Sequence, residues 1–381
     1  MNEIHRTIEY TYVLLSHTDE DTFLSLEDLE LIGAYKRKYV PFSAFFATMM
    51  SYPVLRVADE NDRTNATLAL LAAILSIKVL DNINDDLHTI EEAVESLDFQ
   101  GRAFLDEEFS YKTERNVIAR AENWTYLMAR WTYDILYSSA DCRSHSFELY
   151  KKDMCKYIAG QKESFYQRLE PENQLLPRSL GDYLSSTCEK GIGNIWFDMA
   201  FCFYEKNNGL LDHRQSKVAS GIKYAMALAY KSFLLYDDVS DLRDDLLHHI
   251  VNSAVLYAAD HQLLSLDIAF ENVDKTVLRL EKTGVLRDVM HLGDLIFLKA
   301  MQSLEAVRET YSGSMDIDAI LFGLRVLRVF TMRKWILDEK SLDSFSALTR
   351  SFYSSDKIMD TIPARLLGYE KFLDSPDIIF H

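Results

Sequence analysis

Apolar residues recur at intervals of three and four along most of the chain, which is the spacing typical of amphipathic α-helices. This pattern predicts helices over nine ranges: 24–50, 64–90, 114–139, 145–168, 179–206, 214–249, 251–282, 286–311 and 316–336. Turn-forming residues gather at the breaks, for example in Glu170-Pro171-Glu172-Asn173. Asp62 is expected to start one helix, and Ser179 or Gly181-Asp182 another. The pattern therefore predicts an all-α protein.

The segment 90–113 departs from this pattern, because it is acidic and carries few periodic apolar residues. We expect it to form a long loop or lid. No connection is rich enough in Gly, Ser or Pro to be a flexible linker, and the chain has no internal repeat. We therefore expect a single domain over residues 1–381.

The composition agrees with a helical protein. Only 13 Gly and 6 Pro occur in 381 residues, and their scarcity favours long helices with few breaks. Apolar residues make up 48% of the chain, which is enough to bury a sizeable core. The formal net charge of −18 argues against nucleic acid and anionic membrane surfaces as partners, because both would be repelled.

The cysteines and the N-terminus give information on the cellular compartment in which the protein is expected. The four cysteines (Cys142, Cys155, Cys188 and Cys202) show neither a CxxC pattern nor a Cys/His metal spacing, so we expect reduced core thiols. The first residues lack the apolar core of a signal peptide, and no apolar run is as long as a membrane span. These features predict a soluble, cytoplasmic protein without stable membrane insertion.

Two aspartate clusters stand at the ends of long apolar helical runs, at residues 81–86 and 237–245. Residues four apart lie on one face of a helix, so Asp81 aligns with Asp85, and Asp237 aligns with Asp241 and Asp245. Carboxylate oxygens without clustered Cys or His suit a hard cation such as Mg²⁺, which completes its shell with water and phosphate oxygens. A solvated acidic face is the alternative interpretation of each cluster.

With these clusters in place, the region 31–260 resembles the class I isoprenoid synthases, which include trans-prenyl diphosphate synthases, class I terpene synthases and squalene/phytoene synthases. The segment Asp81 to Asp86 lies where the family has its first aspartate-rich motif, and Asp237-Asp238-Val239-Ser240-Asp241 matches the second, DDxxD. The resemblance implies a single-domain helical bundle around a central active-site cavity, with the two aspartate-bearing helices facing each other across its mouth.

Further positions carry the same resemblance. Ala159-Gly160-Gln161 is similar to the Gly-Gln helix of prenyl diphosphate synthases, and Lys190 falls where the family has a lysine that contacts the diphosphate. The segment Tyr35 to Pro41 is similar to the basic segment GGKRxRP. Two segments are similar to squalene synthase motifs: Leu80 to Asp86, and Cys155 to Gly160.

The chain also departs from the family pattern. No Arg-Arg-Gly follows the first motif, the second position of that motif is Asn82, and Ala34 and Tyr35 replace the two glycines of GGKRxRP. The missing arginines make condensation with isopentenyl diphosphate harder to justify. Lys78 lies on the same helix face as Asp81 and could neutralise it without a metal.

The resemblance implies Mg²⁺, with three ions bound together with an allylic prenyl diphosphate. The expected metal ligands are Asp81, Asp85, Asp86, Asp237, Asp238, Asp241 and Asp245. Lys190 and Arg243 are the expected catalytic residues, and the expected diphosphate-binding residues are Lys36, Arg37, Lys38, Gln161 and Lys190. Three alternatives remain open for these cations: Lys190 as a helix-end cation, residues 36–38 as an exposed turn, and Arg243 as a counter-charge to nearby aspartates.

Three functions compete. The first is a terpene synthase that ionises an allylic polyprenyl diphosphate, with cyclisation or elimination and release of diphosphate. The second is a trans-prenyltransferase that joins two isoprenoid units. The third is a non-catalytic helical subunit that binds an active homologue, which Asn82 and Lys78 favour. Family members are often dimers, so a homodimer is a further expectation.

Overall fold

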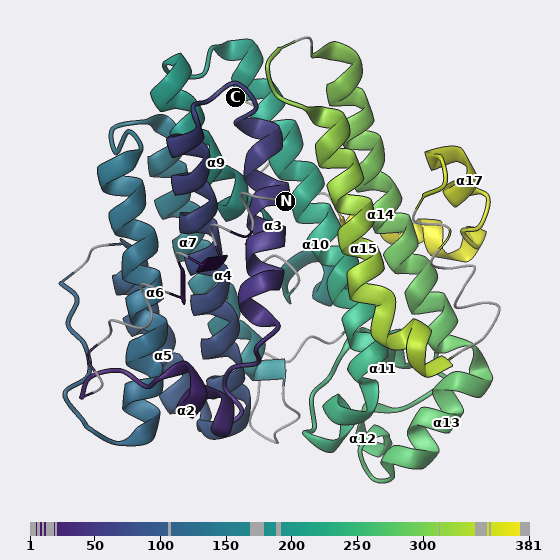
Figure 1. Ribbon diagram of the computed structural model, residues 1–381. Coiled ribbons are helices and arrows are strands. Elements are labelled where there is room, and N and C mark those ends of the chain that lie inside the picture. Colours follow the sequence, from purple (N-terminus) through teal and green to yellow (C-terminus); the bar gives the residue numbers. More distant parts are fainter. Residues whose placement is uncertain are drawn as a thin grey trace. The chain divides into compact units, whose positions relative to one another are not determined.

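Helices dominate the computed structural model (Figure 1). It describes residues 21–105, 108–167, 179–187, 192–311, 313–339 and 352–373, together with the isolated positions 5, 8, 9, 11, 12, 19 and 349. In these residues the remaining regular structure is a bridge at Ile250, so the all-α class is confirmed. The α-helices are α2 (Leu26–Leu31), α3 (Tyr39–Val54), α4 (Glu60–Leu87), α5 (Ile90–Leu105), α6 (Val117–Ser139), α7 (His145–Ser164), α8 (Leu180–Asp182), α9 (Ile192–Asn208), α10 (His213–Leu247), α11 (Ser253–Asp260), α12 (Leu266–Ala269), α13 (Val273–Thr283), α14 (Val285–Thr310), α15 (Ile317–Glu339) and α17 (Ser355–Met359). The 3₁₀ segments η1 (Phe165–Gln167) and η3 (Ala364–Phe372) and the π-helical turn η2 (Tyr183–Thr187) complete the set.

The chain forms two compact units. Unit 1 contains residues 1–162, 194–215 and 313–316, and unit 2 contains residues 163–193, 216–312 and 317–381. Neither unit is one continuous stretch of sequence. The expectation of a single domain stays a prediction.

Helix α4 is the central element of unit 1. Asp59 caps its first turn by accepting a hydrogen bond from the backbone N–H of Asp62, so the helix starts slightly earlier than expected. Its side chains pack against α3, α5 and α6, and its fully buried residues include Leu70, Leu71 and Leu75. Full burial of each leucine contributes roughly 2 kcal/mol.

Contrary to the expectation that no apolar run is long enough, α4 could cross a membrane by length and composition alone. However, 72% of its apolar window is buried within the protein. This degree of burial is typical of a core helix, because the apolar side chains contact other helices.

The segment 90–113, expected to be a loop or lid, instead forms α5 over most of its length. Thr89 and Glu92 make a capping box, in which the Glu92 carboxylate accepts from the backbone N–H of Thr89 and the Thr89 hydroxyl accepts from that of Glu92. Ser96 and Gln100 occupy buried positions on the inner face. These polar residues hide the helical period in the sequence. The Ser96 hydroxyl donates to Asn84, and the amide nitrogen of Gln100 donates to Ser76.

Three other expected helices are divided, and one of them, the range 179–206, separates into α8, η2 and α9. The range 24–50 divides into α2 and α3, because the chain reverses at Gly33, whose φ of 84° favours glycine. The range 251–282 divides into α11, α12 and α13, and Asn272 caps the last of these. Ser179 caps α8 as expected.

In unit 2, α10 and α14 approach each other closely. A side-chain carbon at Gly293 of α14 would lie 2.5 Å from the ring of Tyr236 of α10, so only glycine fits there. The Tyr236 hydroxyl donates to Asp294 at 2.8 Å and accepts from Arg328 at 2.9 Å. Arg328 is 1% exposed and also pairs with Asp294, so this network joins three helices inside unit 2.

The cysteines of the described residues are free thiols: Cys142, Cys155 and Cys202. Cys202 is a buried core residue as expected, whereas Cys155 is exposed. Cys188 lies outside the described residues.

Candidate functional site

The first aspartate cluster lies at the C-terminal end of α4, in unit 1. The ammonium of Lys78, one turn earlier, lies 2.8 Å from Oδ2 of Asp81, and this ion pair raises the pKa of Lys78. Both side chains are partly exposed. The Asp81 carboxylate is therefore partly neutralised within the protein. Asp85 and Asp86 follow on the exposed surface of the same helix.

Asn82, at the second position of this cluster, has a structural role. Its amide nitrogen donates to the backbone oxygen of Ala34 at 2.8 Å and to the hydroxyl of Tyr39 at 2.9 Å. Ala34 and Tyr39 flank the basic segment Lys36-Arg37-Lys38. The structure thus brings that segment close to the first aspartate cluster, although 43 residues separate Asn82 from Tyr39 in the sequence.

The basic segment itself is an exposed turn before α3. Arg37 is directed to Glu30, with its Nε 2.9 Å from Oε2 of that residue. Lys36 and Lys38 are also exposed. The interpretation of residues 36–38 as an exposed turn is therefore confirmed, whereas diphosphate binding by these residues stays a prediction.

The second aspartate cluster lies on α10, in unit 2, and its helix is uninterrupted from residue 213 to residue 247. Asp237 is exposed, whereas Asp238, Asp241 and Asp245 are partly buried. The four-residue spacing predicted from sequence is therefore realised on one helix. Asp237, Asp241 and Asp245 form a carboxylate stripe along it.

Neutral donors surround the buried side of this cluster. Oδ2 of Asp238 accepts from the hydroxyl of Tyr183 at 2.9 Å and from the backbone N–H of Ser253 at 3.0 Å. The amide nitrogen of Asn252 donates to Oδ2 of Asp245 at 2.8 Å and to the backbone oxygen of Asp238 at 3.1 Å. These hydrogen bonds hold the carboxylates in place without adding positive charge.

The pKa of Asp245 reflects both its burial and the carboxylates around it. Burial, followed by repulsion from the carboxylate of Asp238, raises the pKa of Asp245 to about 8, against the lowering effect of the Asn252 hydrogen bond. Asp241 and Asp237 raise it further. A cation bound to this cluster would relieve the repulsion.

The other residues expected to act in catalysis or to bind the diphosphate are Arg243, Gln161 and Lys190. Arg243 of α10 forms an exposed ion pair with Asp274 of α13 at 2.5 Å. Gln161 of α7 is partly buried and donates to the hydroxyl of Tyr157 at 2.9 Å. Lys190 lies outside the described residues. The roles expected for all three stay predictions.

The carboxylate clusters suit Mg²⁺ in their donor chemistry. Mg²⁺ takes hard oxygen ligands, keeps several waters, and is commonly held by one or two carboxylates together with substrate phosphates. Within the described part of the chain, no group of three or more His, Cys, Asp or Glu residues is arranged to hold a metal ion by itself. Binding of three Mg²⁺ ions therefore stays a prediction that depends on the diphosphate as a further ligand.

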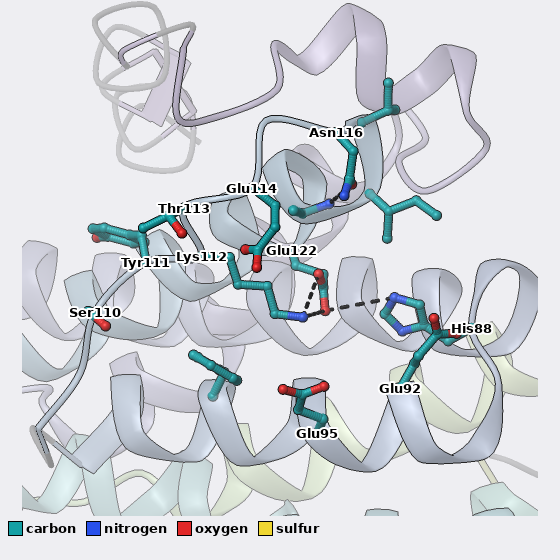
Figure 2. Close-up of a pocket in the computed structure, with 14 residues that line it drawn as sticks. His88, Glu92, Glu95, Ser110, Tyr111, Lys112, Thr113, Glu114, Asn116 and Glu122 are labelled. Atoms are coloured by element: carbon teal, nitrogen blue, oxygen red, sulfur yellow. Dashed lines mark hydrogen bonds and ion pairs between the residues drawn. The ribbon is translucent and has the colours of Figure 1, made fainter.

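Unit 1 also contains a cavity of about 670 Å³ that sequence reasoning missed. Its walls come from α5, the start of α6 and the segment between them, together with His88 (Figure 2). Glu122 of α6, 2% exposed, binds the ammonium of Lys112 through both oxygens, at 2.8 and 2.9 Å. The hydroxyl of Tyr126 also donates to Glu122, at 3.1 Å.

A hydrogen-bonded chain links this cavity to the first aspartate cluster. Nδ1 of His88 lies 2.8 Å from the side-chain oxygen of Asn84, which also accepts from the hydroxyl of Ser96. Nε2 of His88 lies 3.7 Å from Glu122, and burial lowers the pKa of His88. The position of Glu122 on the apolar face of its helix, between Ala119 and Tyr126, is the sequence signal that could have revealed it.

Comparisons with known proteins give little further information. Neither the protein-family models nor the curated proteins include a match to this chain. Among solved structures, the chain is similar to linalool/nerolidol synthase from Streptomyces clavuligerus, solved in complex with 2-fluorogeranyl diphosphate. The two chains share 11% sequence identity with a TM-score of 0.42, over 89% of this chain and 98% of the other. This similarity is too low to assign the chain to a family.

Proposed function

We propose that this protein is a Mg²⁺-dependent class I isoprenoid synthase that ionises an allylic polyprenyl diphosphate, with the cyclisation or elimination chemistry of a terpene synthase. The observation that carries the proposal is the carboxylate stripe of α10. Asp237, Asp241 and Asp245 project from one uninterrupted helix, and Tyr183, Asn252 and Ser253 hold the cluster from its buried side. A rigid helix places ligands more accurately than a loop does.

The proposed roles follow from the positions of these groups. The carboxylates of Asp237, Asp241 and Asp245 would hold Mg²⁺ on α10, and those of Asp81, Asp85 and Asp86 would hold it on α4. Mg²⁺ held there would offset the charge of the leaving diphosphate and orient it. Gln161, Lys190 and the basic turn 36–38 are proposed to contact the diphosphate, and Arg243 to add positive charge after leaving its exposed partner Asp274.

A trans-prenyltransferase is the second candidate. Asn82 ties the basic turn 36–38 to the acidic end of α4, and a condensing enzyme needs such a basic surface for a second diphosphate. Against this candidate, the segment 87–92 after the first motif lacks the Arg-Arg-Gly that condensing enzymes of the resembled family carry shortly after that motif.

A non-catalytic subunit is the third candidate. The ion pair between Lys78 and Asp81 favours it, because the ammonium of Lys78 offsets the charge of this carboxylate without a metal. Asn82 also agrees with this candidate, because its side chain is a hydrogen-bond donor to the turn before α3 and not a carboxylate that could bind a metal.

Product analysis separates the three candidates. Purified protein is incubated with Mg²⁺ and geranyl, farnesyl or geranylgeranyl diphosphate, with and without isopentenyl diphosphate. A hydrocarbon or alcohol formed without isopentenyl diphosphate is the expected result. A longer diphosphate formed only in its presence would favour the transferase. If no substrate releases diphosphate under any condition, the proposal of an enzyme fails.

A further inference from the structure

The cavity of unit 1 has an unbalanced charge. Four carboxylates line it, those of Glu92, Glu95, Glu114 and Glu122, against the single ammonium of Lys112. His88 adds no positive charge in its neutral form, which burial favours by lowering the pKa of its imidazole. The lining therefore attracts cations and repels anions such as phosphates.

The cavity already holds one ammonium group, supplied by the protein itself. Lys112 places its Nζ within hydrogen-bond distance of both oxygens of Glu122 and 5.3 Å from the centre of the Phe99 ring. A carboxylate together with an aromatic face is a favourable environment for an alkylammonium ion. Glu122 and Phe99 therefore form a part of the cavity that suits an alkylammonium group.

Two of the four carboxylates remain as acceptors for a ligand. Glu92 is engaged in capping α5, and Glu122 is engaged by Lys112 and Tyr126. For Glu95 and Glu114, the described residues provide no hydrogen bond or ion pair. In Figure 2 their carboxylates point toward the Lys112–Glu122 pair from α5 and from the segment before α6, respectively.

Apolar surface also lines the cavity. Val117 and Ile118 line the cavity and are 48% and 36% exposed. A cavity of about 670 Å³ is within the usual range for small-molecule sites. An aliphatic chain on these two side chains would remove apolar surface from water.

We propose that this cavity binds an aliphatic primary ammonium ion, which donates hydrogen bonds to Glu95 and Glu114 and packs its alkyl chain on Val117 and Ile118. A divalent metal ion fits less well, because no group of three or more His, Cys, Asp or Glu residues in the described part of the chain is arranged to hold one. None of the residues that line this cavity is a proposed metal ligand or diphosphate contact, so the proposal does not depend on the proposed enzymatic function.

Calorimetry on the full-length protein at physiological salt and neutral pH tests the site. The probes are hexylamine, hexanol and hexanoate, which share an alkyl chain and differ in charge. The variant Glu95→Gln/Glu114→Gln removes the two acceptors with little change in shape. The matched variant Glu91→Gln/Glu281→Gln removes the same charge at exposed positions outside the cavity.

We expect hexylamine to bind the unmodified protein, and hexanol and hexanoate to bind at least about tenfold more weakly. The Glu95/Glu114 variant should weaken hexylamine binding by about tenfold, while the Glu91/Glu281 variant should stay within about twofold of the unmodified protein. Absence of hexylamine binding would overturn the proposal. So would equal weakening in both variants, because that result shows attraction to the net charge alone, or equal binding of hexanol.

Discussion

The two aspartate clusters differ in how the protein stabilises them. On α4, the ammonium of Lys78 neutralises Asp81, and Asn82 is engaged in holding the turn before α3. On α10, neutral donors hold Asp238 and Asp245, and burial, followed by repulsion from Asp238, raises the pKa of Asp245 to about 8. A cation bound near Asp245 would offset the repulsion that raises the pKa of this residue, whereas a cation on α4 would compete with Lys78 for Asp81. On this ground we expect the second cluster to be the stronger candidate for metal binding.

The largest expected effect is the loss of activity in Asp237→Ala. We expect diphosphate release from the best substrate to fall by about a thousandfold, because an exposed ligand of the carboxylate stripe is removed. Steady-state assays of diphosphate release measure this effect. Glu281→Ala, an exposed acid on α13, is the matched control and should retain full activity. Retention of activity in Asp237→Ala would remove the basis for assigning the metal to α10.

Asn82→Asp tests whether the amide hydrogen bonds of Asn82 stabilise the fold. The new carboxylate would face the backbone oxygen of Ala34 without a hydrogen to donate, so we expect a loss of about 2 kcal/mol in the free energy of unfolding. Urea denaturation measures it. Asp86→Asn, an exposed change in the same cluster, should alter stability by less than about 0.5 kcal/mol. An Asn82→Asp variant as stable as the unmodified protein would show that the amide hydrogen bonds contribute nothing.

Tyr183→Phe tests how the second cluster is held. The change removes the hydroxyl that donates to Asp238, and we expect a loss of about 1 kcal/mol in the free energy of unfolding. Tyr137→Phe, at an exposed tyrosine of α6, serves as the comparison and should leave stability unchanged. Equal stability of the Tyr183 and Tyr137 variants would contradict the role of the hydroxyl.

Lys78→Met should have the smallest effect, in the opposite direction. Removal of the competing ammonium is expected to lower the Mg²⁺ concentration for half-maximal activity by about threefold, because the exposed ion pair is worth less than about 1 kcal/mol. Lys78→Arg retains the charge and should leave the Mg²⁺ requirement unchanged. An increased Mg²⁺ requirement in Lys78→Met would mean that Lys78 assists the site.

The sequence was sufficient for the helical class and for most long helices, since their apolar residues follow the helical period. It was insufficient for α5, because buried Ser96 and Gln100 interrupt the apolar pattern and their partners lie on another helix. The alignment of Asp237 with Asp241 and Asp245 followed from spacing alone. Their surroundings did not, since the Tyr183 donor lies 55 residues from Asp238 in the sequence.

The same limit explains why the packing role of Asn82 and the cavity of unit 1 were not predicted. The sequence presented Asn82 as a lost ligand, but its partners Ala34 and Tyr39 become neighbours only when the chain folds. Glu122 has its partner Lys112 on a preceding non-helical segment, where no periodic pattern points to a contact. Long-range hydrogen bonds and ion pairs of this kind leave no local signature.

Binding of inorganic diphosphate, measured by calorimetry with and without Mg²⁺, tests the central claim most directly. The unmodified protein should bind diphosphate only when Mg²⁺ is present, and Asp237→Ala should lose most of that binding while Glu281→Ala keeps it. Absence of binding, or binding that depends on neither Mg²⁺ nor Asp237, would contradict the claim that the α10 carboxylates hold a metal–diphosphate complex.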